Sequence, residues 1–257
     1  MWNESDDAVG ELLRSTVLRG GGRFDDSVVI SGWWAKHGIT IAPIELNRNS
    51  LFSIATRYRE ANEPDWVSFL WHVLAWGAMG DFRNIPRIVG SVDSAERHAE
   101  LNALLAGASE ASFAGNCASA YRMFYGKIPR LGPAFFSKFL YFTSDRNSVN
   151  PSPLILDSRV SSALFTLIGS NYSRQDSDTY GKFCSDLHRW SNDFDTPADV
   201  IEFRLYQFGQ LIDSSRWKWL HAEASLYREG RPQVGFDEIA EEMVRRANGM
   251  DQRGENR

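Results

Sequence analysis

The sequence predicts an all-α fold of about ten helices. Apolar residues recur at helical spacing along most of the chain, for example at Trp66, Phe69 and Val73. Strand-like alternation is nearly absent, and segments 27–30 and 39–41 are too short to build a sheet. The hydrophobic (43%) and charged (24%) fractions are those of a globular protein with its own core.

Several predicted helices follow a polar or proline-containing start. Asn47, Ser94 and Pro197 lie at positions where a side-chain oxygen caps a helix or a proline opens one. We expect helices at residues 51–58, 65–76, 95–105, 118–124, 134–142, 158–167, 180–190, 198–211 and 236–247.

Cysteine, histidine and membrane signals exclude several classes of protein. Two cysteines, Cys117 and Cys184, are too few for a disulfide framework, and the five histidines show no metal-binding spacing. No apolar run is long enough to cross a bilayer, and the acidic start around Glu4 lacks the features of a signal peptide. We therefore expect a cytoplasmic protein without a metal site, with both cysteines in its core.

Charge is distributed unevenly along this acidic chain. The net charge is −5, but residues 122–159 contain six basic and two acidic side chains, a net of +4 that leaves −9 for the remainder. A local basic face on an acidic body suits a protein that meets one short stretch of phosphates. Ordinary scatter of charge is the alternative interpretation. The six basic residues are Arg122, Lys127, Arg130, Lys138, Arg146 and Arg159.

A short turn between two predicted helices has the composition of an anion site. Residues 128–132, Ile-Pro-Arg-Leu-Gly, form this turn. The first amides of a helix lack internal partners and attract phosphate. Gly132 permits close approach of a phosphate, Pro133 suits the first helical position, and Lys127 and Arg130 add positive charge. An ordinary helix-helix turn is the alternative.

A lysine and an aspartate near this turn form a candidate catalytic pair. Lys138 lies among phenylalanines on a helix that is hydrophobic nearly all round. Desolvation lowers the pKa of a lysine, and a neutral amine is a nucleophile. Asp157 follows the apolar run 153–156 at the predicted start of the next helix. The alternatives are a lysine at the exposed edge of a core helix and a plain N-cap aspartate.

The turn, Lys138 and Asp157 together resemble the helix-hairpin-helix 8-oxoguanine DNA glycosylases, in particular prokaryotic proteins with that fold and archaeal relatives. The likeness covers roughly residues 30–215. It implies a single glycosylase unit whose helices form two lobes, with the active site in the cleft between them. Residues 1–22 are then an N-terminal extension, and residues 216–257 a C-terminal helix and polar tail. The segments of likeness are 128–142, 154–160, 74–77, 81–87 and 179–203.

Two positions depart from the family pattern. Arg130 stands where the hairpin usually has its first glycine, and Ala134 stands where the lysine usually lies. Lys138 is one helical turn later on the same helix face, so its amine is expected to reach the same cleft. The archaeal relatives are similar in placing their lysine at this later position.

The resemblance implies a role for each candidate residue. Lys138 attacks the sugar of a flipped nucleotide to form a Schiff base that permits β-elimination, and Asp157 stabilises the positive charge on the sugar. No metal or cofactor is expected, the partner is double-stranded DNA with a damaged or modified base, and the protein is expected to be a monomer. Contacts to the DNA backbone are expected from Lys127, Arg130, Leu131, Gly132, Arg146 and Arg159. Contacts to the flipped or orphan base are expected from Arg83, Asn84, Arg87, Glu202 and Tyr206.

Three interpretations of the function differ in substrate or in class. The first is a DNA glycosylase/AP lyase acting on 8-oxoguanine in base excision repair. The second is an anti-phage glycosylase that excises a hypermodified base from foreign DNA, since prokaryotic relatives occur in anti-phage gene clusters. The third is a non-catalytic helix-hairpin-helix module that only binds duplex DNA. The sequence does not decide among them, because the volume of a base pocket is not readable from it.

Overall fold

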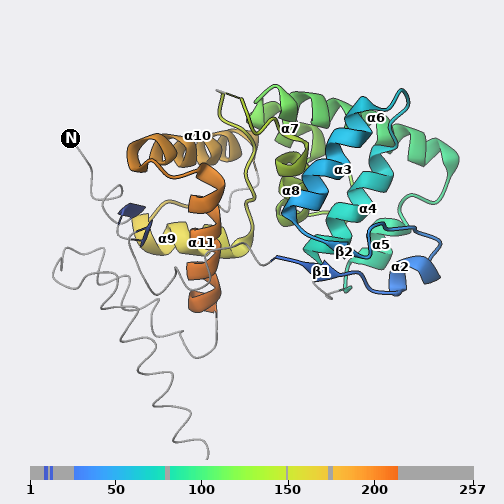
Figure 1. Cartoon of the computed structure of the whole chain (residues 1–257), viewed down its shortest axis with the longest axis horizontal. Helices are drawn as coiled ribbons and strands as arrows, with labels where there is room; N and C mark the ends of the chain where they lie inside the picture. Colours follow the sequence, from blue (N-terminus) through green and yellow to red (C-terminus); the bar gives the residue numbers. More distant parts are fainter. Residues whose placement is uncertain are drawn as a thin grey trace, which may run out of the picture. The chain divides into compact units, whose positions relative to one another are not determined.

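The computed structural model describes residues 9–10, 12–13, 26–78, 82–148, 150–172 and 176–213, and helices dominate this part of the chain (Figure 1). Ten helices and one pair of two-residue strands lie within it. The all-α fold predicted from apolar periodicity is therefore confirmed. The helix predicted at 236–247 lies outside the described residues.

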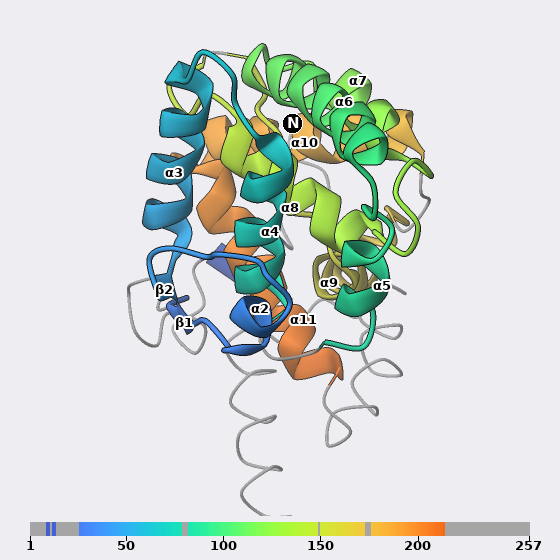
Figure 2. The ribbon, with the colours of Figure 1, turned by 90° about the vertical axis from the view of Figure 1, so that its right-hand side faces the viewer.

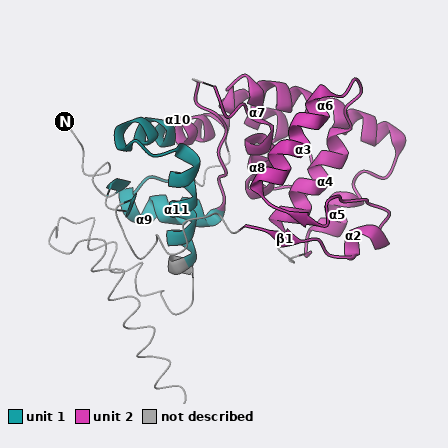
Figure 3. Cartoon of the chain, in the orientation of Figure 1, with its two compact units in different colours: residues 1–23, 158–174, 186–257 teal, residues 24–157, 175–185 magenta. Residues whose placement is uncertain are grey.

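The chain forms two compact units (Figure 3). Unit 2 comprises Phe24–Asp157 and Gln175–Ser185. Unit 1 comprises Met1–Arg23, Ser158–Arg174 and Asp186–Arg257. The chain passes from unit 2 to unit 1 directly after Asp157, so the two candidate catalytic residues, Lys138 and Asp157, both belong to unit 2. Helix α10 (Ser177–Phe194) continues from unit 2 into unit 1.

Unit 2 is organised around α8 (Pro133–Thr143). This helix packs against α3 (Arg48–Glu60) and α4 (Trp66–Gly77), and the three lie side by side (Figures 1 and 2). Helix α6 (Ala95–Phe113) contacts α4 and α8 and also packs along α7 (Cys117–Phe124). Neighbouring helices thus cover α8 on several sides. This agrees with its sequence, which is apolar nearly all the way round the helix.

Aromatic rings fill the space around α8. The ring centroid of Phe139 lies 5.5 Å from that of Phe69, 5.2 Å from that of Phe124 and 6.1 Å from that of Trp66. These tilted and edge-on contacts are the favourable geometries for aromatic pairs. Because Phe139 directly follows Lys138, the lysine emerges from a helix that its neighbours hold firmly.

Side-chain caps are present at the starts of three helices of unit 2, and those at Asn47 and Ser94 were predicted from the sequence. Asn47 and Ser50 form a reciprocal capping box at the start of α3. The side chains of Asp65 and Ser94 accept hydrogen bonds from backbone amides at the starts of α4 and α6. Each cap satisfies an amide that has no partner within the helix. The starts of these helices are thus determined by local sequence.

The sequence pattern missed the shortest elements. Strand β1 (Val28–Val29) pairs antiparallel with β2 (Glu45–Leu46), so the expectation of no sheet around Val28 is wrong, and segment 39–41 belongs to neither strand. A two-residue ladder has no alternation to detect, and the surrounding chain decides its pairing. Helices α2 (Trp33–Lys36) and α5 (Ile85–Val89) are likewise too short to show a helical period.

Unit 1 contains a close crossing of two helices. Helix α9 (Ser158–Ile168) packs against α11 (Ala198–Asp213). A Cβ atom added at Gly209 would lie 2.2 Å from the backbone oxygen of Arg159. Only a residue without a side chain fits at this crossing, so the backbones of the two helices come into direct contact.

Candidate functional site

The hairpin between α7 and α8 is anchored by its apolar residues and exposes its basic ones. Ile128 and Leu131 are buried, whereas Lys127 and Arg130 are exposed. Arg97 of α6 donates a hydrogen bond from Nη2 to the backbone oxygen of Lys127 at 3.1 Å. Sequence analysis missed Arg97, because it lies thirty residues before the turn that it braces and no local pattern links the two.

Backbone strain in the turn falls on Arg130. Its φ angle is 67°, in the left-handed region that favours glycine, and this is the position where the family pattern has its first glycine. Gly132 has φ −86° and ψ 171°, which any residue adopts. A Cβ added at Gly132 would meet nothing within 4 Å, so the space beside it is open, and the expected phosphate contact there stays a prediction.

Pro133 begins α8, as predicted, and Gly132 is the residue before the helix. Gly132 has no side chain that could cap the helix, and the amides of Phe135 and Phe136 donate to its backbone oxygen at 3.0 and 3.2 Å. A helix start of this kind, next to exposed Lys127 and Arg130, has the charge that a phosphate requires.

Lys138 directs its amine back toward the hairpin. Its side chain is half-buried, and Nζ donates a hydrogen bond to the backbone oxygen of Ala134 at 2.8 Å. Nζ also lies 5.7 Å from the ring centroid of Phe135. Ala134 is the position where the family pattern places its lysine, so the Lys138 amine lies one turn back along the helix, beside that position. That the amine reaches the active-site cleft stays a prediction.

Gly77, at the end of α4, makes room for this lysine. A Cβ added at Gly77 would lie 2.9 Å from Cδ of Lys138 and 3.4 Å from Cε. Because a side chain at Gly77 would displace the lysine stem, the glycine leaves room for the path that the stem takes along α8. Gly77 lies in segment 74–77, one of the segments of family likeness, but its role beside Lys138 was not predictable from the sequence.

Asp157 ends a buried extended segment. Leu154, Ile155 and Leu156 are buried, Asp157 is half-buried, and α9 begins at the next residue. The backbone amide of Leu156 donates to Oγ of Ser137 at 3.0 Å. The residue before Asp157 is thus bonded to the residue before Lys138.

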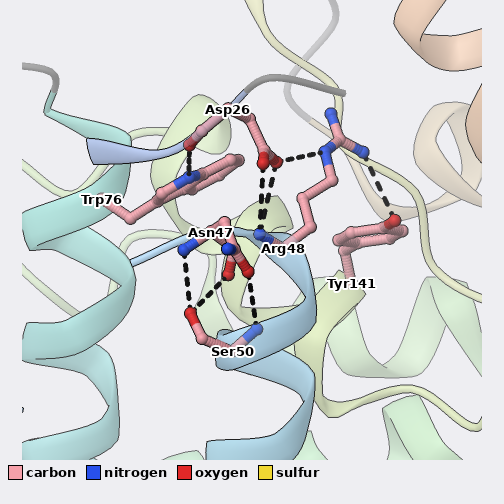
Figure 4. A network of polar contacts seen from close by, with 6 residues as sticks. All are labelled: Asp26, Asn47, Arg48, Ser50, Trp76 and Tyr141. Carbon is pink, nitrogen blue, oxygen red and sulfur yellow. Dashed lines mark hydrogen bonds and ion pairs between the residues drawn. The ribbon is translucent and has the colours of Figure 1, made fainter. Parts of the chain in front are cut away.

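A buried arginine network lies at the end of α8 beyond Lys138 (Figure 4). Arg48, only 9% exposed, pairs through Nε with Oδ2 of Asp26 at 3.3 Å and donates from Nη1 to the hydroxyl of Tyr141 at 3.3 Å. Trp76 donates from Nε1 to the backbone oxygen of Asp26 at 2.8 Å. Trp76 directly precedes Gly77 on α4, and Tyr141 follows Lys138 by about one turn on α8. The network therefore connects the end of α4 beside the lysine stem to the helix that carries Lys138.

A match to one protein-family model includes all the residues of this arrangement. A family model described as "Putative 8-oxoguanine DNA glycosylase OGG-like protein" matches residues 24–206. The chain belongs to this family. No curated protein and no solved structure matches the chain. The resemblance inferred from the hairpin, Lys138 and Asp157 is therefore confirmed as membership of the OGG-like family.

Arg146 does not belong to the basic cluster of the hairpin in this OGG-like protein. It follows the C-terminal end of α8, where its guanidinium lies 4.6 Å from the ring centroid of Phe52. Lys127 and Arg130 precede the other end of the helix, and eleven residues of helix span about 16 Å. Closeness in sequence therefore does not place these cations together, because a helix separates residues at its two ends.

The predicted base contacts occupy two places in the OGG-like chain. Arg83, Asn84 and Arg87 are exposed around the start of α5 in unit 2. Glu202, only 1% exposed, and Tyr206 lie on α11 in unit 1. A pocket in the cleft between the lobes stays a prediction.

Arg159 and Tyr206, expected in different roles, contact each other in unit 1. Arg159 donates from Nη1 to the Tyr206 hydroxyl at 2.7 Å, and its guanidinium lies 5.2 Å from the ring centroid. The guanidinium therefore occupies a position over the ring that was expected to stack on a base. A phosphate contact by Arg159 would be made by a guanidinium that is already bonded to the Tyr206 hydroxyl.

The described part of the OGG-like chain contains neither a metal-binding cluster nor a membrane-spanning helix. Among the described residues, no three His, Cys, Asp or Glu side chains gather so that they hold a metal ion. Within the same residues, no helix is long and apolar enough to cross a membrane. Cys117 and Cys184 are buried free thiols, as predicted, and burial raises the pKa of Cys184 well above its usual value.

Proposed function

We propose that this protein is a DNA glycosylase/AP lyase that flips a damaged or modified base out of duplex DNA and cleaves it from the sugar. Lys138 is the nucleophile, Asp157 the stabilising carboxylate, and the hairpin the element that binds the DNA backbone. The observation that supports this best is the half-buried Lys138 amine, which returns to Ala134 in the first turn of the helix that the hairpin opens.

The chemistry follows from what each side chain supplies. The neutral amine of Lys138 attacks C1′ of the flipped nucleotide while the C1′–N bond breaks, and the base leaves with the bonding electrons and takes up a proton. The sugar ring opens to give a Schiff base, and loss of a C2′ proton then expels the 3′ phosphate by β-elimination. The Asp157 carboxylate stabilises the positive charge that develops on the sugar. The Ala134 carbonyl accepts a hydrogen bond from the amine and orients it.

Borohydride trapping on a duplex containing 8-oxoguanine tests the role of Lys138. The wild type should become covalently linked to the DNA, and Lys138→Gln should not, while its duplex affinity stays within about threefold because the lysine is no phosphate contact. Lys182→Gln, at an exposed lysine of α10, is the matched control and should trap normally. Trapping that persists in Lys138→Gln would remove Lys138 from the site.

The role of Asp157 is tested by Asp157→Asn. Asparagine caps a helix as well as aspartate does but carries no charge, so a pure cap would be replaced with little loss. Charge stabilisation predicts that single-turnover excision falls by about a hundredfold or more. A panel with 8-oxoguanine, hypoxanthine, uracil and modified cytosines shows which base the wild type excises. Activity confined to a cytosine derivative favours the foreign-DNA substrate, and duplex binding without excision favours the non-catalytic module.

A further inference from the structure

The extended segment 151–157 is held by side chains rather than by a sheet. It forms neither helix nor strand, yet Leu154 and Leu156 are buried, so their backbone groups need partners. Tyr180 donates from its hydroxyl to the backbone oxygen of Leu154 at 2.8 Å, and Cys117 donates from Sγ to that of Pro151 at 3.3 Å. The position of this segment therefore depends on a few individual hydrogen bonds.

Ser137 bonds the residue directly before Asp157. Its hydroxyl oxygen accepts from the amide of Leu156 at 3.0 Å, and the hydroxyl donates to the backbone oxygen of Leu156 at 3.4 Å. Ser137 is 0% exposed, so water cannot replace these bonds. The Ser137 hydroxyl thus bonds both backbone polar groups of Leu156. Ser137 directly precedes Lys138, and Leu156 directly precedes Asp157.

On the basis of the function proposed above, we propose that Ser137 is a positioning residue that holds Asp157 in register with Lys138. The bonds connect α8 to segment 151–157 and to no other element. Loss of the hydroxyl leaves a buried amide unpaired at Leu156 and allows the backbone there to shift. A displacement of about 1 Å in a reacting constellation lowers a rate by about a hundredfold. Ser137 therefore acts through Asp157 and does not touch the substrate.

Ser112 provides a matched control. It is also 0% exposed, and its hydroxyl also donates to a backbone oxygen of α8, that of Leu140. This bond joins α6 to α8 and does not involve segment 151–157. Ser112→Ala and Ser137→Ala remove the same chemical group from equally buried places, one on α6 where it bonds α8 and one on α8 itself.

The experiment compares Ser137→Ala with Ser112→Ala at a temperature where both are folded. Single-turnover excision and duplex affinity are measured for each variant, together with hydrogen exchange at the Leu156 amide. Ser137→Ala should excise about ten- to a hundredfold more slowly, with affinity within twofold of wild type and faster exchange at Leu156. Ser112→Ala should stay within about threefold of wild type in all three. Ser137→Cys, which keeps the size but weakens the hydrogen bonds, should lie between wild type and Ser137→Ala and serves if the alanine variant does not fold.

Each outcome decides a different point. Equal excision by the Ser137 and Ser112 variants, with an active wild type, overturns the positioning role and leaves the glycosylase intact. A wild type that excises no base from the panel overturns the proposed function, and the positioning role with it. A loss of duplex affinity in Ser137→Ala as large as its loss of excision assigns Ser137 to the general stability of the hairpin and also overturns the positioning role.

Discussion

Arg130 combines a strained backbone with an exposed charge. Its φ of 67° lies where residues other than glycine are disfavoured, and such positions cost on the order of 1 kcal/mol. The family pattern has glycine at this place. The guanidinium is exposed at the turn before α8, where positive charge favours phosphate. Arginine at this position thus combines a cost in backbone strain with a cation beside the start of α8.

Two substitutions at Arg130 separate the strain from the charge. Arg130→Gly and Arg130→Ala remove the same charge, but only glycine adopts the left-handed conformation without strain. The free energy of unfolding of the glycine variant should exceed that of the alanine variant by about 1 kcal/mol. Duplex affinity should fall equally in both. Urea titration and DNA titration measure the two effects, and equal stability of the two variants would contradict the strain.

At the scale of single elements, the two ends of α8 carry different cations. Lys127 and Arg130 precede its start, where helix amides and positive charge coincide, and Arg146 follows its end and lies over Phe52. Lys127→Ala should therefore flatten the dependence of log affinity on log salt by about 0.9, the effect of one lost phosphate contact. Arg146→Ala removes an equal charge from the far end and should leave the slope unchanged. Equal slopes for the two variants would mean that the hairpin is not the element that binds DNA.

The crossing of α9 and α11 predicts opposite effects for two glycine-to-alanine changes. A Cβ at Gly209 would lie 2.2 Å from a backbone oxygen, which cannot move as a flexible side chain does. Gly209→Ala should lower the free energy of unfolding by about 3 kcal/mol or more. At Gly107, inside α6, the nearest atom is Sδ of Met123 at 3.6 Å, an ordinary contact. Gly107→Ala should raise stability by about 0.5–1 kcal/mol through helix propensity. Thermal or urea unfolding checks both signs.

At the scale of the whole molecule, stability should fall in mild acid because of His72. Burial lowers the pKa of His72 below its ordinary value of 6.5, although its ring nitrogens contact the backbone oxygens of Ser68 at 2.7 Å and Ala42 at 3.2 Å. Below pH 6.5 the unfolded chain binds a proton that the folded chain takes up only at its lower pKa. The contribution of neutral His72 is thus complete above pH 6.5 and is lost as the pH falls toward the folded pKa.

His72→Gln should remove this part of the pH dependence. The difference in unfolding free energy between wild type and variant should be constant above neutral pH. It should change by at most about 1.4 kcal/mol per pH unit below pH 6.5, the limit for one proton. Urea titrations between pH 5 and 8 measure it. Parallel pH profiles for the two proteins would show that another group causes the acid sensitivity.

Local patterns in the sequence determined much of this protein. The long helices, the caps at Asn47 and Ser94, the hairpin, and the candidates Lys138 and Asp157 were all predictable. Each depends on residues within a few positions of one another, so periodicity, capping and turn composition are enough to find them. The family, which the match over residues 24–206 confirms, was recognised from the same short segments.

The tertiary structure alone decided which distant residues support the site. Arg48 pairs with Asp26 and bonds Tyr141, which lies 93 residues away, and Gly77 makes room for Lys138. Ser137 bonds Leu156 across 19 residues. Arg146, close to the hairpin in sequence, lies at the far end of a helix from it. These relations depend on packing between elements, because a contact between residues far apart in the chain has no periodicity or spacing that a single sequence displays.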